Sequence, residues 1–409
     1  MTEPHDKIRE TVVGHLSKDR LRAIHRNIGE TIERNENVSV ENLYTTLQRQ
    51  SLPTESQLDT PGRVYDLALH FDAAGVKNKA LVYSLLAAEH AKRQFAIDVS
   101  LTLFLKAETL AHEQLPVIRY RIASGRGATL LLAGKYSDAH ATFDNAIKLA
   151  DTETERIWVK SKYAEIAYQA GSLSKRMSIY EGILKTLGIK VRRSRMGLVW
   201  DICWFRILDV IRSTFSVRSQ VIPSETDSNF VSTLQTLQGF ARPCCFRDPL
   251  LAIWSISKSG ILADRNSDPA LRCSLKSHQG WILGILCCEE EQARHSFSEA
   301  FQIAQELNDL PLQARSAFLR SATLANLGCF DDALREIESS RTLYLQIGDQ
   351  YYATFSRYIR SLISSRLGNV NACVCDASHA FQNAVITKQY RLAQSAVAPW
   401  SIATNGNFP

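Results

Sequence analysis

Apolar residues recur at intervals of three and four positions along most of the chain, while the strict alternation typical of strands is nearly absent. This periodicity predicts one amphipathic helix after another. Gly75 separates two such patterns, where a helix C-terminus favours a residue that tolerates positive φ. The apolar faces on either side of it comprise Tyr65, Leu69 and 71–74, and then Leu81, Leu85, Ala88 and Ala91.

The helical pattern is itself repeated. The spacing of Gly134, Tyr136, Ala139, Phe143 and Ala146 matches the second half of a tetratricopeptide unit. In such a unit, small residues such as Gly127 let two antiparallel helices pack closely, and an aromatic ring fills the space beside them. The pattern returns at Gly171, but Arg176 stands there in place of the alanine, so that copy is degenerate.

A second series of repeats lies towards the C-terminus. Cys288, Gly328 and Gly368 occupy equivalent positions, each 40 residues after the last. Together, the two series predict an all-α fold, a tetratricopeptide-like α-solenoid of stacked helical hairpins in two blocks. The alternative is an irregular helical bundle with accidental periodicity.

The segment between the two series has a different character. It begins with the basic cluster 190–195 and continues into an apolar stretch, 198–211, that contains Trp200 and Trp204. Charged residues such as Asp201 interrupt this stretch, so it predicts an amphipathic or buried helix with an internal packing role in preference to lipid contact. The cluster also lacks the interleaved aromatics that nucleic-acid binding by base stacking requires.

Composition changes this picture little. The chain has 409 residues, enough for two or three domains, and a net charge of +6, which does not indicate a nucleic-acid partner. No run of about 18 apolar residues indicates a membrane span, and the N-terminal sequence does not read as a signal peptide. All nine cysteines follow residue 200, and their odd number favours a reducing cytoplasm.

The N-terminal segment carries a family resemblance. It reads His5-Asp6-Lys7-Ile8-Arg9-Glu10, followed after a gap by His25-Arg26-Asn27-Ile28 and Glu33. This string resembles the segment that joins the ATPase module to the helical repeats in multidomain signal-transduction ATPases, which also carry Ser/Thr kinase, histidine kinase or cyclase units. The resemblance extends through both repeat series and the insertion. It implies that nucleotide chemistry lies upstream of His5.

With this resemblance, we divide the chain into six parts. We expect the first part to be less ordered than the repeats, because its apolar face would have nothing to cover it. The parts are 1–35, a remnant of a helical or winged-helix segment that follows an ATPase module; 36–60, a linker; 61–185, the first helical-repeat block; 186–230, a basic and apolar connecting insertion; 231–390, the second helical-repeat block; and 391–409, a tail.

Motifs for catalysis and cofactor binding are missing from the sequence. No stretch fits the phosphate-binding pattern G-x-x-x-x-G-K-[ST], and the kinase motifs and the G-x-S-x-G elbow are also missing. Two groups approach metal-ligand composition, but neither has a partner pair at zinc-finger spacing. They are Cys373, Cys375 and His379, and Cys287, Cys288 and His295. We therefore expect no enzyme activity, no cofactor and no metal.

These observations favour a non-enzymatic, regulatory protein-interaction module of a signalling ATPase or kinase system. A protein or peptide partner, such as an ATPase or kinase module, is expected to bind the concave face, and neither nucleic acid nor a membrane is. We assign to that face Arg121, Ser124, Ala128 and Leu131 in the first block, and His278, Arg315 and Phe318 in the second. Two alternatives are an inactive fragment of a multidomain ATP-binding kinase and an enzyme of unrecognised type.

Overall fold

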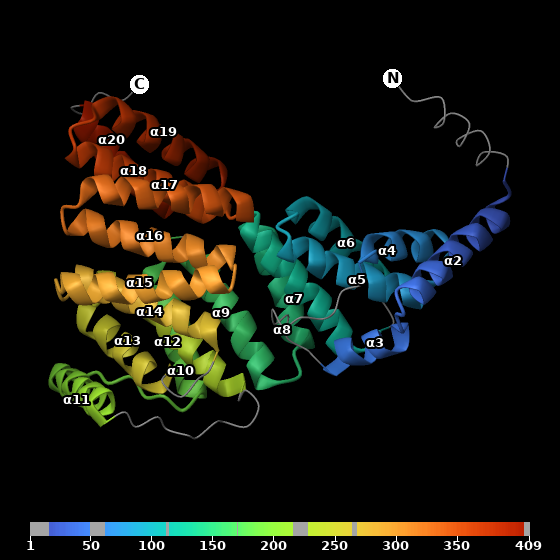
Figure 1. Cartoon of the computed structure of the whole chain (residues 1–409), viewed down its shortest axis with the longest axis horizontal. Coiled ribbons are helices and arrows are strands. Elements are labelled where there is room, and N and C mark those ends of the chain that lie inside the picture. The colour runs from blue at the N-terminus through green and yellow to red at the C-terminus, as the bar shows by residue number, and fades with distance from the viewer. Residues whose placement is uncertain are drawn as a thin grey trace. The chain divides into compact units, whose positions relative to one another are not determined.

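The computed structural model describes residues 16–49, 62–111, 114–169, 171–215, 228–263 and 268–404. Within these ranges the regular secondary structure is entirely helical, from α2 to α20 (Figure 1), which confirms the predicted all-α solenoid of helical hairpins. The chain divides into two compact units. Unit 1 comprises 1–131 and 136–155, and unit 2 comprises 132–135 and 156–409.

Unit 1 is a stack of helices with an apolar core that includes Leu67, Phe71, Leu85 and Phe104. Its helices are α2 (Lys18–Asn35), α3 (Val40–Arg49), α4 (Val64–Ala73), α5 (Lys77–Arg93), α6 (Ile97–Leu110), α7 (Pro116–Leu132) and α8 (Tyr136–Leu149).

The hairpin of α7 and α8 has the packing that the repeat motif predicts. A Cβ atom on Gly127 would lie only 2.6 Å from Cε1 of Phe143, so the aromatic ring occupies the space above the glycine. Ala139 and Ala146, one turn to either side of Phe143, are fully buried. The predicted pairing of a small residue with an aromatic ring is therefore what joins this hairpin.

Two assignments near the N-terminus differ from the structure. The expected linker 36–60 contains helix α3, whose Leu47 is 1% exposed because it packs into the core of unit 1. The apolar face of α2 is covered in part, since Ile32 is buried in the same core while Ile24 and Ile28 are each 38% exposed. Residues 1–15, which include the His5-Asp6 motif, lie outside the described residues.

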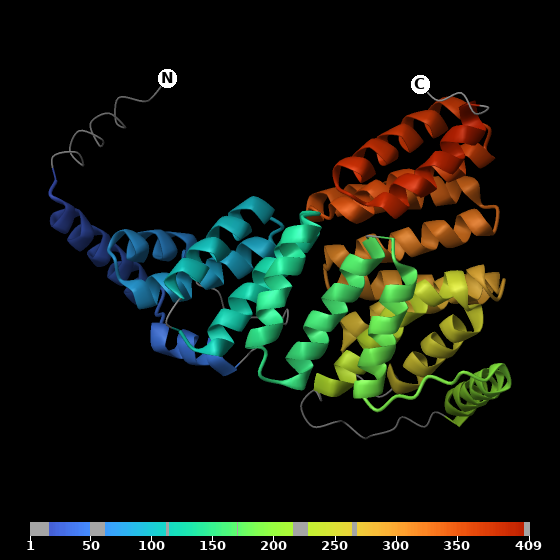
Figure 2. The same cartoon turned by 180° about the vertical axis from the view of Figure 1, so that it is seen from behind.

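Unit 2 is a longer stack of hairpins, coloured green to red in Figures 1 and 2. Its helices are α9 (Glu153–Gln169, mostly in this unit), α10 (Leu173–Thr186), α11 (Arg195–Phe215), α12 (Ser228–Arg247), α13 (Pro249–Ala263), α14 (Pro269–Ile285), α15 (Glu290–Glu306), α16 (Leu310–Asn326), α17 (Phe330–Ile347), α18 (Gln350–Arg366), α19 (Val370–Ile386) and α20 (Tyr390–Thr404).

The spacing of 40 residues marks the turns between the paired helices of this stack. Gly328 and Gly368 end α16 and α18 with left-handed φ values of 83° and 74°, and Cys288 takes φ 57° at the equivalent turn. Glycine adopts this region without strain, which explains its use at two of the three turns. The repeat read from the sequence is therefore a real structural period.

The boundaries of the second block also differ from the expected ones. Helix α10 belongs with unit 2, because Tyr180 packs closely over Gly239 of α12. The expected tail 391–409 begins with helix α20, whose Leu392 and Trp400 are buried. The C-terminal sequence carries enough apolar residues for one more packed helix. Residues 405–409 lie outside the described residues.

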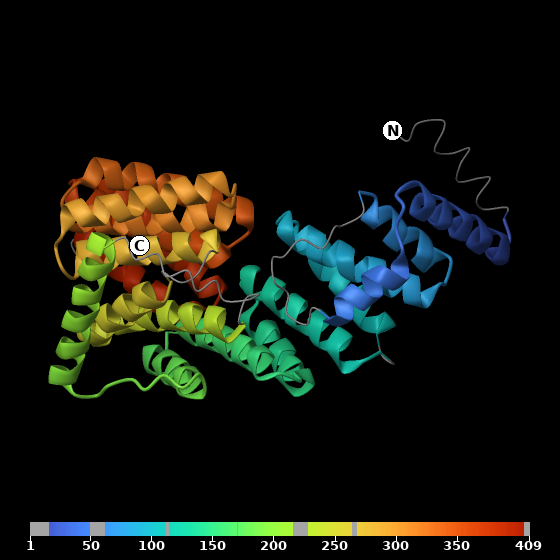
Figure 3. The same ribbon diagram turned by 60° about the horizontal axis from the view of Figure 1, so that its bottom comes forward.

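The insertion forms helix α11, which lies along one edge of unit 2 in Figure 3. One face of this helix packs on α13, where the indole Nε1 of Trp254 donates a hydrogen bond to Asp201 at 3.1 Å. The other face is open, with Trp200 71% exposed and Trp204 50% exposed. The expected internal packing role therefore describes only one face of the helix.

Candidate functional site: a buried cluster of arginine and tyrosine in unit 2

Helices from opposite ends of unit 2 meet around one group of side chains. The ring of Tyr168 on α9 lies 6.0 Å from that of Tyr351 on α18. The guanidinium of Arg242 on α12 donates a hydrogen bond from Nη1 to the hydroxyl of Tyr352 at 2.6 Å. The turn at Gly171 also contacts Arg391 on α20. We call the side chains at this junction the central cluster: Tyr168, Arg176, Arg242, Arg315, Tyr344, Tyr351, Tyr352 and Arg391.

Two arginines of the central cluster lie against one tyrosine ring. The Cζ atom of Arg176, a residue only 1% exposed, lies 4.2 Å from the centre of the Tyr168 ring. The Cζ atom of Arg391 lies 5.4 Å from the same centre. A cation is attracted to the negative face of an aromatic ring, so Tyr168 helps to hold both guanidiniums in place.

Several buried donors of these arginines have no acceptor among the described residues. They are Nε and Nη2 of Arg176, Nε of Arg242 and Nη1 of Arg391. Buried polar groups in proteins are nearly always hydrogen-bonded, because leaving one unmade costs about 1–3 kcal/mol and more for a charged group. These four donors therefore depart from the usual pairing of buried polar groups.

Two carboxylates lie within electrostatic range of the arginines. Burial alone would raise the pKa of Glu165, but Lys162, Arg242 and other nearby cations outweigh it and lower that pKa. For Asp349 the balance is reversed, and burial raises its pKa to about 6 although its side chain accepts a hydrogen bond from the Tyr352 amide. Both acids therefore lie among the positive charges of the cluster.

A group of aromatic rings lies next to the arginines. The ring of Phe318 on α16 lies 5.6 Å from that of Tyr352 and 5.1 Å from that of Phe355. Tyr344 and Tyr352 stack with their centres 5.0 Å apart. The cluster therefore places apolar rings next to hydrogen-bond donors, a combination that also lines peptide and small-molecule pockets.

His278 lies close to the cluster as a neutral side chain. It is 1% exposed, and its Nδ1 lies 2.7 Å from the carbonyl oxygen of Ser274, to which it donates. Burial, reinforced by the charge of Arg242, lowers its pKa to about 3. The histidine is therefore uncharged at neutral pH and adds no positive charge to the site.

The structure brings together the three predicted residues of the second block. His278, Arg315 and Phe318 all lie at or beside the central cluster, where the charge of Arg315 acts on both His278 and Tyr344. In the first block, Arg121 and Ser124 are buried on α7, and Leu131 is 8% exposed. Ala128, on the same helix, is half-buried. Arg121 is held there by an ion pair with Glu89. Contact of all seven predicted residues with a partner stays a prediction.

Sequence reasoning missed Arg176, Arg242 and Arg391 as site residues. A signal for the first was present, because Arg176 replaces the alanine of the repeat pattern. A long cationic side chain at a position that packing reserves for a small residue indicates selection for something other than packing. No comparable signal identifies Arg242 or Arg391, since their meeting depends on how the hairpins curve.

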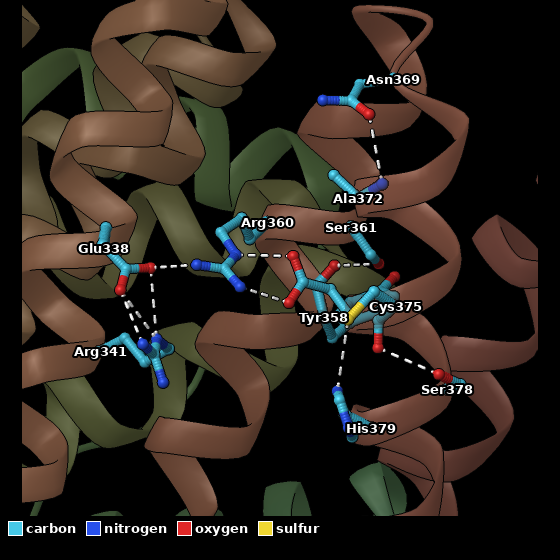
Figure 4. A network of polar contacts seen from close by, with 11 residues as sticks. Glu338, Arg341, Tyr358, Arg360, Ser361, Asn369, Ala372, Cys375, Ser378 and His379 are labelled. Carbon is cyan, nitrogen blue, oxygen red and sulfur yellow. Dashed lines mark hydrogen bonds and ion pairs between the residues drawn. The ribbon is translucent and has the colours of Figure 1, made fainter.

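A second polar network lies between α17, α18 and α19 and is fully paired (Figure 4). Arg360 donates from Nε and Nη2 to both oxygens of Asp376, at 2.6 and 2.5 Å, and also pairs with Glu338. Glu338 in turn accepts from Arg341. These residues adjoin a surface cavity of about 500 Å³, but the matched charges give the network a structural role in joining three helices.

The candidate metal ligands do not converge. Cys373 is buried and donates to the carbonyl oxygen of Pro399 at 3.4 Å, whereas Cys375 is exposed with its Sγ 3.6 Å from Nδ1 of His379. Among the described residues, no three His, Cys, Asp or Glu side chains are grouped as metal ligands. Over the same residues, no helix is both long and apolar enough to span a bilayer.

Comparisons with known proteins identify the fold. A solved structure described as a Rap protein complexed with Competence and Sporulation Factor is similar over 92% of this chain and 97% of its own, with a TM-score of 0.51 and 13% identity. Aspartyl phosphate phosphatase F from Bacillus subtilis aligns over 93% and 96%, with a TM-score of 0.40 and 16% identity. No family model and no curated protein matches the chain. Identity this low shows a shared helical-repeat fold and nothing further.

Proposed function

We propose that this chain is a non-enzymatic regulatory module that binds a peptide, or an extended segment of a partner protein, at the central cluster of unit 2. The observation that carries the proposal is the convergence of arginines and tyrosines from α9, α10, α12, α18 and α20 on one buried place. Stacked hairpins commonly use their inner helices to bind peptides. The similar structure with Competence and Sporulation Factor bound supports this choice of ligand class.

We also propose that the partner system is a signalling ATPase or kinase and that the module acts in the cytoplasm. The first statement rests on the resemblance of 5–33 to the segment beside the ATPase module in signal-transduction ATPases. The second rests on the nine cysteines, all of which are free thiols.

Selection of a random peptide display library on the intact chain tests the proposed binding. Peptides should be enriched, and Tyr352→Ala should release them. The ring of Tyr352 contacts Phe318, and its hydroxyl accepts a hydrogen bond from Arg242. Arg335→Ala is the control, since Arg335 is 75% exposed and pairs only with the neighbouring Asp332 among the described residues. Enrichment that is unchanged in the Tyr352 variant, or no enrichment at all, would contradict the proposal.

A further inference from the structure

The donors of the central cluster indicate more than a general affinity for peptides. We propose that Arg176, Arg242 and Arg391 form a subsite for a carboxylate, which holds an acidic group of the bound peptide. This inference rests on the proposed function and adds the chemistry of its ligand.

The first argument is the balance of charge. The charges of Arg176, Arg242 and Arg315 act on Glu165, and that of Arg315 also acts on Asp349. Arg391 brings a fourth positive charge beside Tyr168. The pKa of Asp349 is raised, so this acid opposes the arginines less than an ordinary carboxylate would. A buried excess of positive charge is unfavourable unless a counter-charge neutralises it. An anionic ligand would supply that charge.

The second argument is the direction of the unused donors. Tyr168 attracts the guanidiniums of Arg176 and Arg391 through its ring and, among the described residues, accepts no hydrogen bond from their N–H groups. Nε and Nη2 of Arg176 form one edge of its planar fork, and neither has an acceptor within the described part of the chain. This pair of donors matches the two oxygens of a carboxylate in the bidentate geometry that arginine favours.

The third argument comes from two other arginines, the buried Arg121 and the half-buried Arg360. Arg360 meets both oxygens of Asp376, and Arg121 meets both oxygens of Glu89. In both cases the protein supplies the carboxylate from its own sequence. At Arg176 the same pair of nitrogens has no acceptor among the described residues, and in our proposal a ligand supplies the matching acid.

Thermal unfolding and calorimetry of the intact chain with three blocked dipeptides test the subsite. N-acetyl-Phe-Glu amide carries a side-chain carboxylate, N-acetyl-Phe-Phe acid carries a terminal one, and N-acetyl-Phe-Gln amide carries none. We expect at least one acid to bind about 10- to 100-fold more tightly than the amide, as for a hydrogen bond to a charged group. The preferred acid tells a side-chain source from a chain terminus.

The arginines are tested by Arg176→Met, with Arg391→Met as the second variant because Arg391 is only half-buried and its removal disturbs less packing. Each change should abolish the preference for the acid, whereas Arg335→Gln should keep it. Equal binding of acid and amide in the unchanged protein would overturn the carboxylate subsite while leaving peptide binding intact. A preference for the acid that persists in both methionine variants would also overturn it.

Discussion

The two units treat buried arginine in opposite ways. In unit 1, Arg121 is 2% exposed and donates from Nε and Nη2 to the two oxygens of Glu89, at 2.6 and 2.8 Å. In unit 2, Arg176 is 1% exposed, but the same two kinds of nitrogen have no acceptor among the described residues. Burial of a charged side chain is therefore not itself a sign of function. What separates a structural arginine from a binding one is whether the fold supplies its counter-charge.

The largest expected effect comes from breaking the pair in unit 1. Glu89→Gln should destabilise unit 1 by about 3–5 kcal/mol, because it leaves a buried guanidinium without its counter-charge. Hydrogen exchange of amides in α5 and α7 measures the loss where it occurs. The matched change in unit 2, Arg176→Met, should cost far less, since no carboxylate among the described residues is hydrogen-bonded to the Nε or Nη2 of Arg176.

Similar losses of stability for Glu89→Gln and Arg176→Met would contradict the contrast between the two units. A loss below about 1 kcal/mol for Glu89→Gln would mean that solvent already screens the pair. A loss of several kcal/mol for Arg176→Met would show that its contacts with Tyr168 are themselves a main support of unit 2.

A smaller effect is expected at the helix crossing of unit 1. Gly127→Ala places a Cβ atom 2.6 Å from Cε1 of Phe143 and should destabilise the unit by about 1–3 kcal/mol through overpacking. Gly182→Ala is the matched control in unit 2. Gly182 lies inside α10 with no atom within 4 Å of the added methyl, so this change should stabilise by up to about 1 kcal/mol. Denaturant unfolding of both variants gives the two signs.

If Gly127→Ala were neutral, the close packing of α7 on α8 would be looser than the structure shows. The pair would then no longer demonstrate that the repeat motif of unit 1 sets its helix spacing.

These crossings show why the fold was predictable and the site was not. Gly127 and Phe143 are close to each other in the sequence, and Cys288, Gly328 and Gly368 recur at a regular interval of 40 residues. A sequence displays both patterns directly. The central cluster instead depends on small rotations between hairpins that accumulate until α9 meets α18 and the Gly171 turn meets α20. The local sequence pattern does not indicate how these rotations add up along the stack. The sequence indicated Arg176 only because it departs from the alanine of the repeat pattern.

Helix α20 and the unit boundary were missed for a related reason. Leu392, Ala396 and Trp400 have helical spacing, but no further repeat follows to confirm it. A terminal helix departs from the consensus because one of its sides has no neighbour to match.

The smallest expected effect concerns pH and the uncharged groups of unit 2. The pKa of His278 is about 3 in the folded protein and near 6.5 when unfolded, so the unfolded chain binds more protons below pH 7 and stability falls on acidification. The pKa of Asp349 is raised to about 6, so here the folded chain binds more protons and stability rises as the pH falls towards 4. Between pH 7 and 5.5 each group contributes about 1 kcal/mol, with opposite signs.

The two contributions should nearly cancel in the unchanged protein and separate in single variants. His278→Gln should make unit 2 more stable at pH 5.5 than at pH 7, and Asp349→Asn should make it less stable, as measured by urea unfolding at both values. Both residues lie in unit 2, so the pH dependence of unit 1 should be the same in both variants and serves as the internal reference. If the two variants had the same pH dependence, these residues would not share the buried, cation-rich surroundings that distinguish unit 2 from unit 1.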